Sequence, residues 1–220
     1  MDEGTEPSPA FMSALVTEHF VLQGASSSTI GESAGRATIY LSSVSSGLVA
    51  IGFASTSQRA LTALACTVLP TVFLLGCFTT VRLVDTSVEN IVALRRIETI
   101  RNYYTSLAPR AAEYFPAAGA TAPGTRGVQY GLWSILFTTA SMISIVNSVL
   151  GGAATALIAA LAATLPVVTA TSLGVVVSTA SLVASLAYQR RRLVPELRFN
   201  PPPVGRMNPE SRDAGPADLV

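Results

Sequence analysis

The sequence contains no lysine and only one histidine, His19, in 220 residues. Without lysine, the chain has no Schiff-base or lysine-nucleophile chemistry. Its two cysteines, Cys66 and Cys77, fall in one apolar segment, where a helix would hold them about 16 Å apart at 1.5 Å per residue, too far for a disulfide. No CxxC, CxxH or HExxH pattern offers a metal site of familiar spacing. We therefore expect no catalytic residues, no metal and no cofactor, and hence a protein that is not an enzyme.

Charge is also scarce. Charged residues make up 12% of the chain, against about 25% in a typical soluble domain. The 14 basic and 13 acidic residues leave a net charge of +1, so the basic field of a nucleic-acid-binding protein is missing. Half of the residues are hydrophobic and the mean hydropathy is +0.49. This composition excludes a disordered chain and an ordinary water-soluble enzyme, and it predicts the lipid bilayer as the main partner.

Long uncharged runs predict an all-α polytopic membrane protein with four transmembrane helices. Residues 37–58 and 60–81 are two uncharged runs bounded by arginines, and each has the roughly 20 residues that a spanning helix needs. Residues 127–189 contain no Asp, Glu, Lys, Arg or His and would reach about 90 Å as one helix. This run is long enough for two spans, which we place at about 130–150 and 167–188.

The uncharged run 127–189 is interrupted by residues that favour breaks between helices. They are Gly151, Gly152 and Pro166, and they separate its two spans. Residues 153–165 lie between them and have two interpretations. They form either a short interfacial helix or an early start of the fourth span, which the chain enters through Pro166.

The arginines predict the orientation, because cytoplasmic loops of membrane proteins carry an excess of Lys and Arg. Six arginines lie between residues 82 and 126, and six more follow the last span, beginning with Arg190, Arg191 and Arg192. Both groups belong in the cytoplasm, which requires an even number of crossings between them. We therefore expect four spans in the inner membrane with both termini cytoplasmic, and Arg190, Arg191 and Arg192 as topology-determining residues.

This topology divides the chain into five segments. They are a cytoplasmic N-terminal segment with a short amphipathic helix (1–28), a first transmembrane hairpin (29–81), a cytoplasmic helix with a Pro/Ala/Gly loop (82–127), a second transmembrane hairpin (128–189) and a disordered Arg/Pro-rich cytoplasmic tail (190–220).

Two helical elements are expected on the cytoplasmic side. Residues 11–22 place their apolar side chains on one broad arc, which favours an interfacial helix or one packed on the bundle. Thr29 and Glu32 have capping-box spacing, so the first transmembrane helix is expected to begin near Thr29, with Glu32 and Arg36 paired one turn apart. Residues 83–107 are expected to continue the second span as a helix that packs on its own chain or binds a partner.

Small and hydroxyl side chains form stripes along the spans. On the fourth span the stripe has spacings of three and four, and the first span has a similar strip that includes Ser42 and Ser45. The fourth-span stripe comprises Thr171, Gly174, Ser178, Ser181 and Ser185. Such stripes favour close helix packing, with the lining of a pore in an oligomer as the alternative. Pro70 predicts a kink in the second span, and Asn147 a hydrogen bond between helices.

The stretch from Ala14 to Gly52 reads ALVTEHFVLQGASSSTIGESAGRATIYLSSVSSGLVAIG. It resembles the N-terminal region of uncharacterised actinobacterial multi-pass integral membrane proteins, in which a TEHFVLQ-type segment precedes the first span. The resemblance implies a bacterial inner-membrane setting and carries no known activity. Together these features predict a non-enzymatic, homo-oligomeric structural or signalling platform with a cytoplasmic protein partner, and a passive pore as the alternative.

Overall fold

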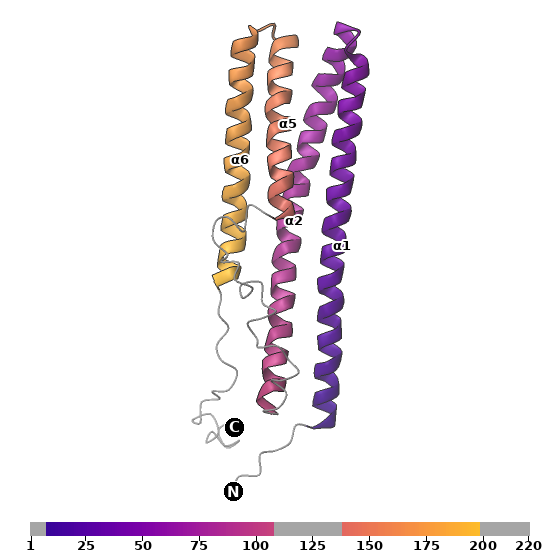
Figure 1. Cartoon of the computed structure of the whole chain (residues 1–220), viewed down its shortest axis with the longest axis vertical. Coiled ribbons are helices and arrows are strands. Elements are labelled where there is room, and N and C mark those ends of the chain that lie inside the picture. The colour runs from indigo at the N-terminus through magenta and orange to yellow at the C-terminus, as the bar shows by residue number, and fades with distance from the viewer. Residues whose placement is uncertain (1–7, 108–137, 199–220) are drawn as a thin grey trace, which may run out of the picture.

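The computed structural model describes residues 8–107 and 138–198. In these ranges the chain forms four helices and no strand: α1 (Pro9–Ala54), α2 (Gln58–Leu107), α5 (Thr139–Leu161) and α6 (Val167–Arg198). Each helix has the length and the apolar composition needed to cross a membrane. They lie side by side in the order α1, α2, α5, α6, with alternating direction (Figure 1). The predicted all-α, four-span architecture is therefore confirmed.

The first helix begins much earlier than predicted. Ser8 caps it by accepting a hydrogen bond from the Phe11 backbone N–H at 3.3 Å, and Pro9 occupies its first turn. The helix then runs without interruption to Ala54, so the predicted separate helix over 11–22 and a helix start near Thr29 were wrong. Thr29 lies inside the helix and its hydroxyl donates to the Ser26 carbonyl at 2.8 Å.

A repeat of three and four residues explains why α1 stays helical through its serine-rich middle. The side chains on its inner face are buried or half-buried, and the matching positions of α2 follow the same spacing over about 40 residues. In α1 they are Met12, Leu15, His19, Leu22, Ser26, Thr29, Ser33, Ala37, Tyr40, Val44, Gly47, Ile51 and Ala54; in α2 they are Ala65, Leu69, Val72, Gly76, Thr79, Leu83, Thr86, Asn90, Ala93, Ile97, Ile100 and Tyr104. The two helices form one continuous antiparallel coiled coil.

The four helices differ in length, and this difference creates a projecting segment. At 1.5 Å per residue, the 46 residues of α1 span about 69 Å and the 23 residues of α5 about 35 Å. Figure 1 shows that all four helices are level at the end where α1 turns into α2, while α1 and α2 extend far beyond α5 at the other end. We call residues 9–31 of α1 and 87–107 of α2 the stalk. The predicted helix over 83–107 is present as the end of α2.

The second hairpin is also shifted relative to its prediction. The third helix begins at Thr139 rather than near residue 130 and continues to Leu161. Residues 153–161 thus extend α5, and neither interpretation of 153–165 was correct. The connection that follows includes Thr164 in the left-handed region, with φ of 50°. Pro166 precedes α6 as expected, and its carbonyl accepts the Ala170 N–H at 3.0 Å. The predicted Pro/Ala/Gly loop and residues 199–220 of the predicted C-terminal tail lie outside the described ranges. Residues 190–198, which were predicted to begin the disordered tail, are instead helical and complete α6.

Glycines allow the closest contacts between helices. A Cβ atom added to Gly152 would lie 2.6 Å from the Gly174 carbonyl oxygen, and one added to Gly174 would lie 2.5 Å from the Gly152 carbonyl oxygen. Gly151 packs in the same way against the ring of Phe73 on α2. Gly151 and Gly152 therefore do not break the helix. They let α5 approach both neighbours, which is the usual role of small residues in membrane helix contacts.

Candidate functional site: polar contacts between the helices

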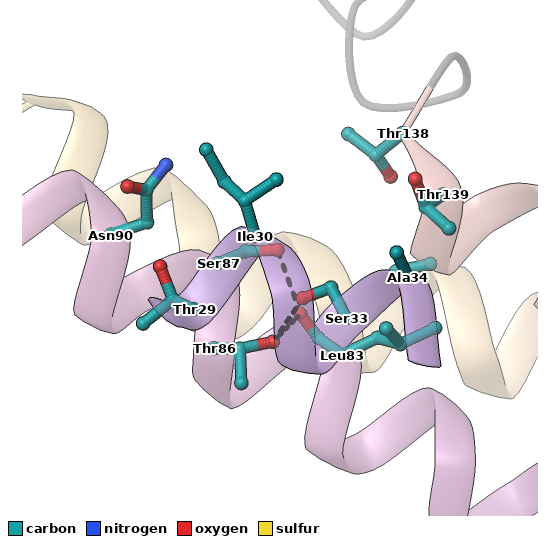
Figure 2. A pocket seen from close by; sticks show the side chains of 11 residues that line it. Thr29, Ile30, Ser33, Ala34, Leu83, Thr86, Ser87, Asn90, Thr138 and Thr139 are labelled. Atoms are coloured by element: carbon teal, nitrogen blue, oxygen red, sulfur yellow. Dashed lines mark hydrogen bonds between the residues drawn. The ribbon is translucent and has the colours of Figure 1, made fainter. Parts of the chain in front are cut away.

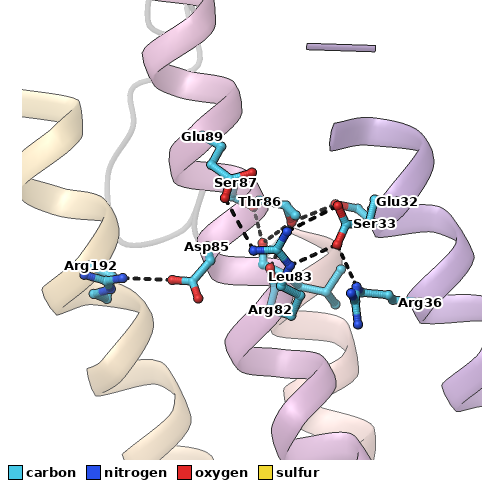
Figure 3. A network of polar contacts seen from close by, with 10 residues as sticks. All are labelled: Glu32, Ser33, Arg36, Arg82, Leu83, Asp85, Thr86, Ser87, Glu89 and Arg192. Atoms are coloured by element: carbon cyan, nitrogen blue, oxygen red, sulfur yellow. Dashed lines mark hydrogen bonds and ion pairs between the residues drawn. The ribbon is translucent and has the colours of Figure 1, made fainter. Parts of the chain in front are cut away.

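Charged side chains gather where the stalk leaves the bundle. Glu32 on α1 accepts a hydrogen bond from Arg36 Nε at 2.9 Å and two from Arg82 on α2, from Nε at 2.9 Å and from Nη2 at 3.3 Å. Arg82 also pairs with Glu89 at 3.4 Å. On the other side of α2, Asp85 pairs with Arg192 of α6 at 2.8 Å. Figure 3 shows these contacts joining three helices at one level. We call these six residues the charged rim.

The ion pairs of the charged rim shift the pKa values of the residues that form them. The pKa of Glu32 is lowered, first because Arg82 donates hydrogen bonds to the carboxylate and second because Arg36 does. The pKa of Arg82 is raised because it donates these hydrogen bonds to Glu32. The pKa of Arg192 is raised by its hydrogen bond to Asp85. All of these side chains remain partly exposed to solvent. Exposed pairs contribute little to stability, so the charged rim fixes the register of the helices more than it holds them together.

A buried polar contact joins α1, α2 and α5 within the predicted spans. Tyr40, which is fully buried, donates to Asn147 Oδ1 at 3.1 Å, and Asn147 Nδ2 donates to Cys77 Sγ at 3.4 Å. The glycine beside Cys77, Gly76, leaves the space that the Asn147 side chain fills. With the third span predicted at about 130–150, Asn147 was expected near one end of that span. The structure places it near the middle of the bundle, and the predicted hydrogen bond between helices is present.

A second buried contact joins α5 and α6. Gln189 is fully buried, accepts a hydrogen bond from Ser141 at 2.7 Å and donates one to Ser144 at 2.8 Å. One turn after Ser144 on α5, the Ser148 hydroxyl lies 3.4 Å from the Ser181 hydroxyl of α6. These bonds satisfy polar groups that would otherwise be costly inside a membrane.

A cavity of about 400 Å³ lies where α5 begins between α1 and α2. Six hydroxyl side chains and one amide line it, together with four apolar residues. They are Thr29, Ile30, Ser33, Ala34, Leu83, Thr86, Ser87, Asn90, Thr138, Thr139 and Ala140. Figure 2 shows Ser33 and Thr86 pointing toward each other, with 2.9 Å between their oxygens. No charged side chain is among the lining residues, so the cavity suits neutral hydrogen-bonding groups.

The structure brings most of the fourth-span stripe to the α5 side. Gly174 is buried against Gly152, Ser178 lies beside Gly152, and Ser181 bonds with Ser148. Ser185 is half-buried, whereas Thr171 is exposed. Within one chain, Gly174, Ser178 and Ser181 therefore contact α5.

Most of the other residues singled out in the sequence lie on exposed surfaces. Ser42 and Ser45 are exposed on the face of α1 that points away from α2. Arg190 and Arg191 are exposed at the end of α6, while Arg192 belongs to the charged rim. Pro70 lies inside α2, which continues through it as a helix.

The sequence analysis missed Tyr40 and Gln189, the two largest polar side chains that are fully buried. Both stand in apolar runs, where a tyrosine or a glutamine resembles an interfacial residue. The available signal was their spacing. Tyr40 falls on the three–four repeat of α1, and Gln189 lies four residues after Ser185 on the fourth-span stripe.

Comparisons with family models, curated proteins and solved structures find no match to this chain. Among residues 8–107 and 138–198, no cluster of three His, Cys, Asp or Glu side chains could hold a metal ion. The function must therefore be argued from the helices and their contacts.

Proposed function

We propose that this protein is a multi-pass protein of the bacterial inner membrane that works as a non-enzymatic, oligomeric structural or signalling platform. The stalk would project into the cytoplasm and present a surface to a protein partner. One observation carries the proposal: α1 and α2 continue past the charged rim as a packed pair that has its own apolar cluster. Leu22, Ala93, Ile97 and Ile100 form that cluster.

The stalk is supported over its whole length. The Ser26 hydroxyl donates to Asn90 Oδ1 at 2.6 Å near the charged rim, and the rings of Phe11 and Tyr103 meet edge to face at 5.7 Å near the tip. A projecting helix pair with contacts at both ends can hold a partner at a fixed distance from the bilayer. The orientation is supported by the excess of arginines on this side, and the bacterial setting by the resemblance of residues 14–52.

Reporter fusions and site-specific crosslinking test the platform. Reporters after Gln58 and Ala160 should give periplasmic signals, and reporters after Pro123 and Val220 cytoplasmic ones. A photo-crosslinking residue at exposed Arg96 in the stalk should then capture one discrete protein in cells. The same residue at Ser55, in the opposite turn, is the matched control. A periplasmic signal at Pro123 would overturn the proposal.

The alternative is a pore lined in an oligomer by the exposed hydroxyls Ser42 and Ser45 of α1. Hydroxyls can line a water-filled path, and these two are not used in contacts with α2. Planar-bilayer recordings of the purified oligomer separate the two functions. Reproducible conductance steps that disappear in Ser42→Leu would favour the pore, whereas a silent oligomer would favour the platform.

A further inference from the structure

We propose that a second copy of this chain docks on the side of α1 that points away from α2. This face, which we call the outer face, includes Phe20, Val21, Gly24, Gly31, Gly35 and Ser42, all of them exposed. Two α1 helices would then run parallel through the membrane and along the stalk. The inference rests on the proposed function in one respect, namely that the protein works as an oligomer.

Large apolar side chains are exposed where the bilayer does not reach. Phe20 is 66% exposed and Val21 is 59% exposed. Because α1 is one continuous helix, Phe20 lies about 24 Å along the axis from Arg36 at 1.5 Å per residue. With the membrane surface placed at the charged rim, side chains at that distance lie in water and not in lipid. An apolar patch of this kind in water marks an interaction surface.

The glycines of the chain fall into two groups. Among the described residues, Gly76, Gly151, Gly152 and Gly174 have no room for a Cβ atom beside a neighbouring helix, and Gly47 has little. On α1, however, a Cβ added to Gly24, Gly31, Gly35 or Gly52 would meet nothing within 4 Å. Glycine is a poor helix former, and three of these positions, Gly24, Gly31 and Gly35, lie on the outer face without a packing reason inside the chain. Close approach of another helix supplies one.

The spacing of Gly31 and Gly35 suits such an approach. Small residues four positions apart let two helices in a membrane contact through their backbones. This pair lies at the level of the charged rim, between Phe20 in the stalk and Ser42 in the span. The crossing point of the two α1 helices is therefore placed where the membrane and stalk contacts meet.

The absence of unpaired charge on the outer face points to an identical partner. Copies of one membrane protein insert with the same orientation, so their α1 helices meet in parallel, and twofold symmetry brings each residue close to its own counterpart. A charged residue on the face would then meet a like charge. From Phe20 to Ser42 the only charged residues of α1 are Glu32 and Arg36, at the edge of the outer face, and they neutralise each other as an ion pair.

Disulfide crosslinking in native membranes tests the contact. The full chain is first freed of its own thiols by Cys66→Ser and Cys77→Ser. Single cysteines are then introduced as Phe20→Cys and Gly24→Cys on the outer face. The matched controls are Asn102→Cys and Ala184→Cys on exposed faces of α2 and α6. After oxidation, we expect the outer-face variants to form at least tenfold more dimer than the controls.

A second variant checks that the face itself drives association. Gly31→Leu adds a side chain into open space within the chain, so the helices of one copy should remain folded, as circular dichroism can verify. We expect its dimer fraction to fall at least tenfold, while Ala184→Leu leaves it unchanged.

Three results would overturn the inference. An oligomer that crosslinks through Asn102 or Ala184 but not through the outer face would leave the proposed function standing. A mass in lipid nanodiscs that corresponds to a monomer would overturn both this inference and the oligomeric platform of the proposed function. Protection of the Phe20→Cys thiol from maleimide in a monomer would show that the chain's own residues cover this face.

Discussion

The contact of α5 with α6 and the contact of α1 with α2 in the stalk use different side chains. Between α5 and α6, glycines bring two backbones together, and buried Ser and Gln side chains bond across. In the stalk, Leu22, Ile97 and Ile100 form an apolar cluster. Lipid offers no hydrophobic force between helices, so packing and hydrogen bonds must act there, whereas water drives apolar side chains together. The difference is the one that lipid around the first region and water around the second would favour.

Gly152→Ala should break the first contact and have the largest effect. The new methyl group would lie within 2.6 Å of the Gly174 carbonyl and of the Ser178 Cβ, so α5 and α6 must separate. We expect a loss of about 3 kcal/mol, typical of overpacking, measured by unfolding in mixed micelles. Gly52→Ala, which adds the same methyl group into open space, should be neutral or stabilising; equal losses in both variants would contradict the backbone contact.

Ile97→Ala should weaken the stalk and leave the span intact. Ile97 is 5% exposed, and truncating a buried Ile costs about 2–5 kcal/mol; we expect the low end of that range because the stalk has only two helices. Hydrogen exchange should speed up in residues 9–31 and 87–107 and stay unchanged in α5. Leu107→Ala, at a position 41% exposed, is the control. Faster exchange throughout α5 would show that stalk and span unfold together.

Gln189→Leu should have a smaller effect, because hydrogen bonds between membrane helices are worth about 0.6 kcal/mol each on average. The variant loses the bonds to Ser141 and Ser144, for an expected cost of about 1 kcal/mol. A double-mutant cycle with Ser144→Ala isolates one bond. Strict additivity of the two single variants would mean that this bond contributes nothing.

Glu32→Gln should have the smallest effect, and one that depends on pH. The pKa of Glu32 is lowered by its arginine partners, so its contribution is present above the ordinary glutamate pKa of about 4.3 and is lost as the pH falls through the lower folded value. The thermal stabilities of wild type and variant should differ slightly at pH 7 and converge at acidic pH. Glu89→Gln, which removes only a 3.4 Å pair, should shift them less. If the difference in thermal stability between wild type and Glu32→Gln grew on acidification, the pKa of Glu32 would be raised in the folded protein and not lowered.

Hydropathy and charge were enough to predict the four spans, since both depend on local composition. The continuity of α1 was not predictable in this way. Ser26, Thr29 and Ser33 hold its contact positions near the charged rim, and a repeat carried by polar residues gives no hydropathy signal. The pair of glycines at 151 and 152 was interpreted as a break because its partner, Gly174, lies on another helix. Likewise, the partners of Asn147 could not be predicted, because Tyr40 and Cys77 come from two distant segments.

The unbroken passage of α1 and α2 through the charged rim has a mechanical consequence. Both helices are continuous from the section within the bundle to the section beyond it, so the pair would move as a lever. A small pivot of α1 and α2 against α5 would be amplified at Phe11 and Tyr103, far from the pivot point. A change in the bilayer or in neighbouring helices can thereby be converted into displacement at the tip.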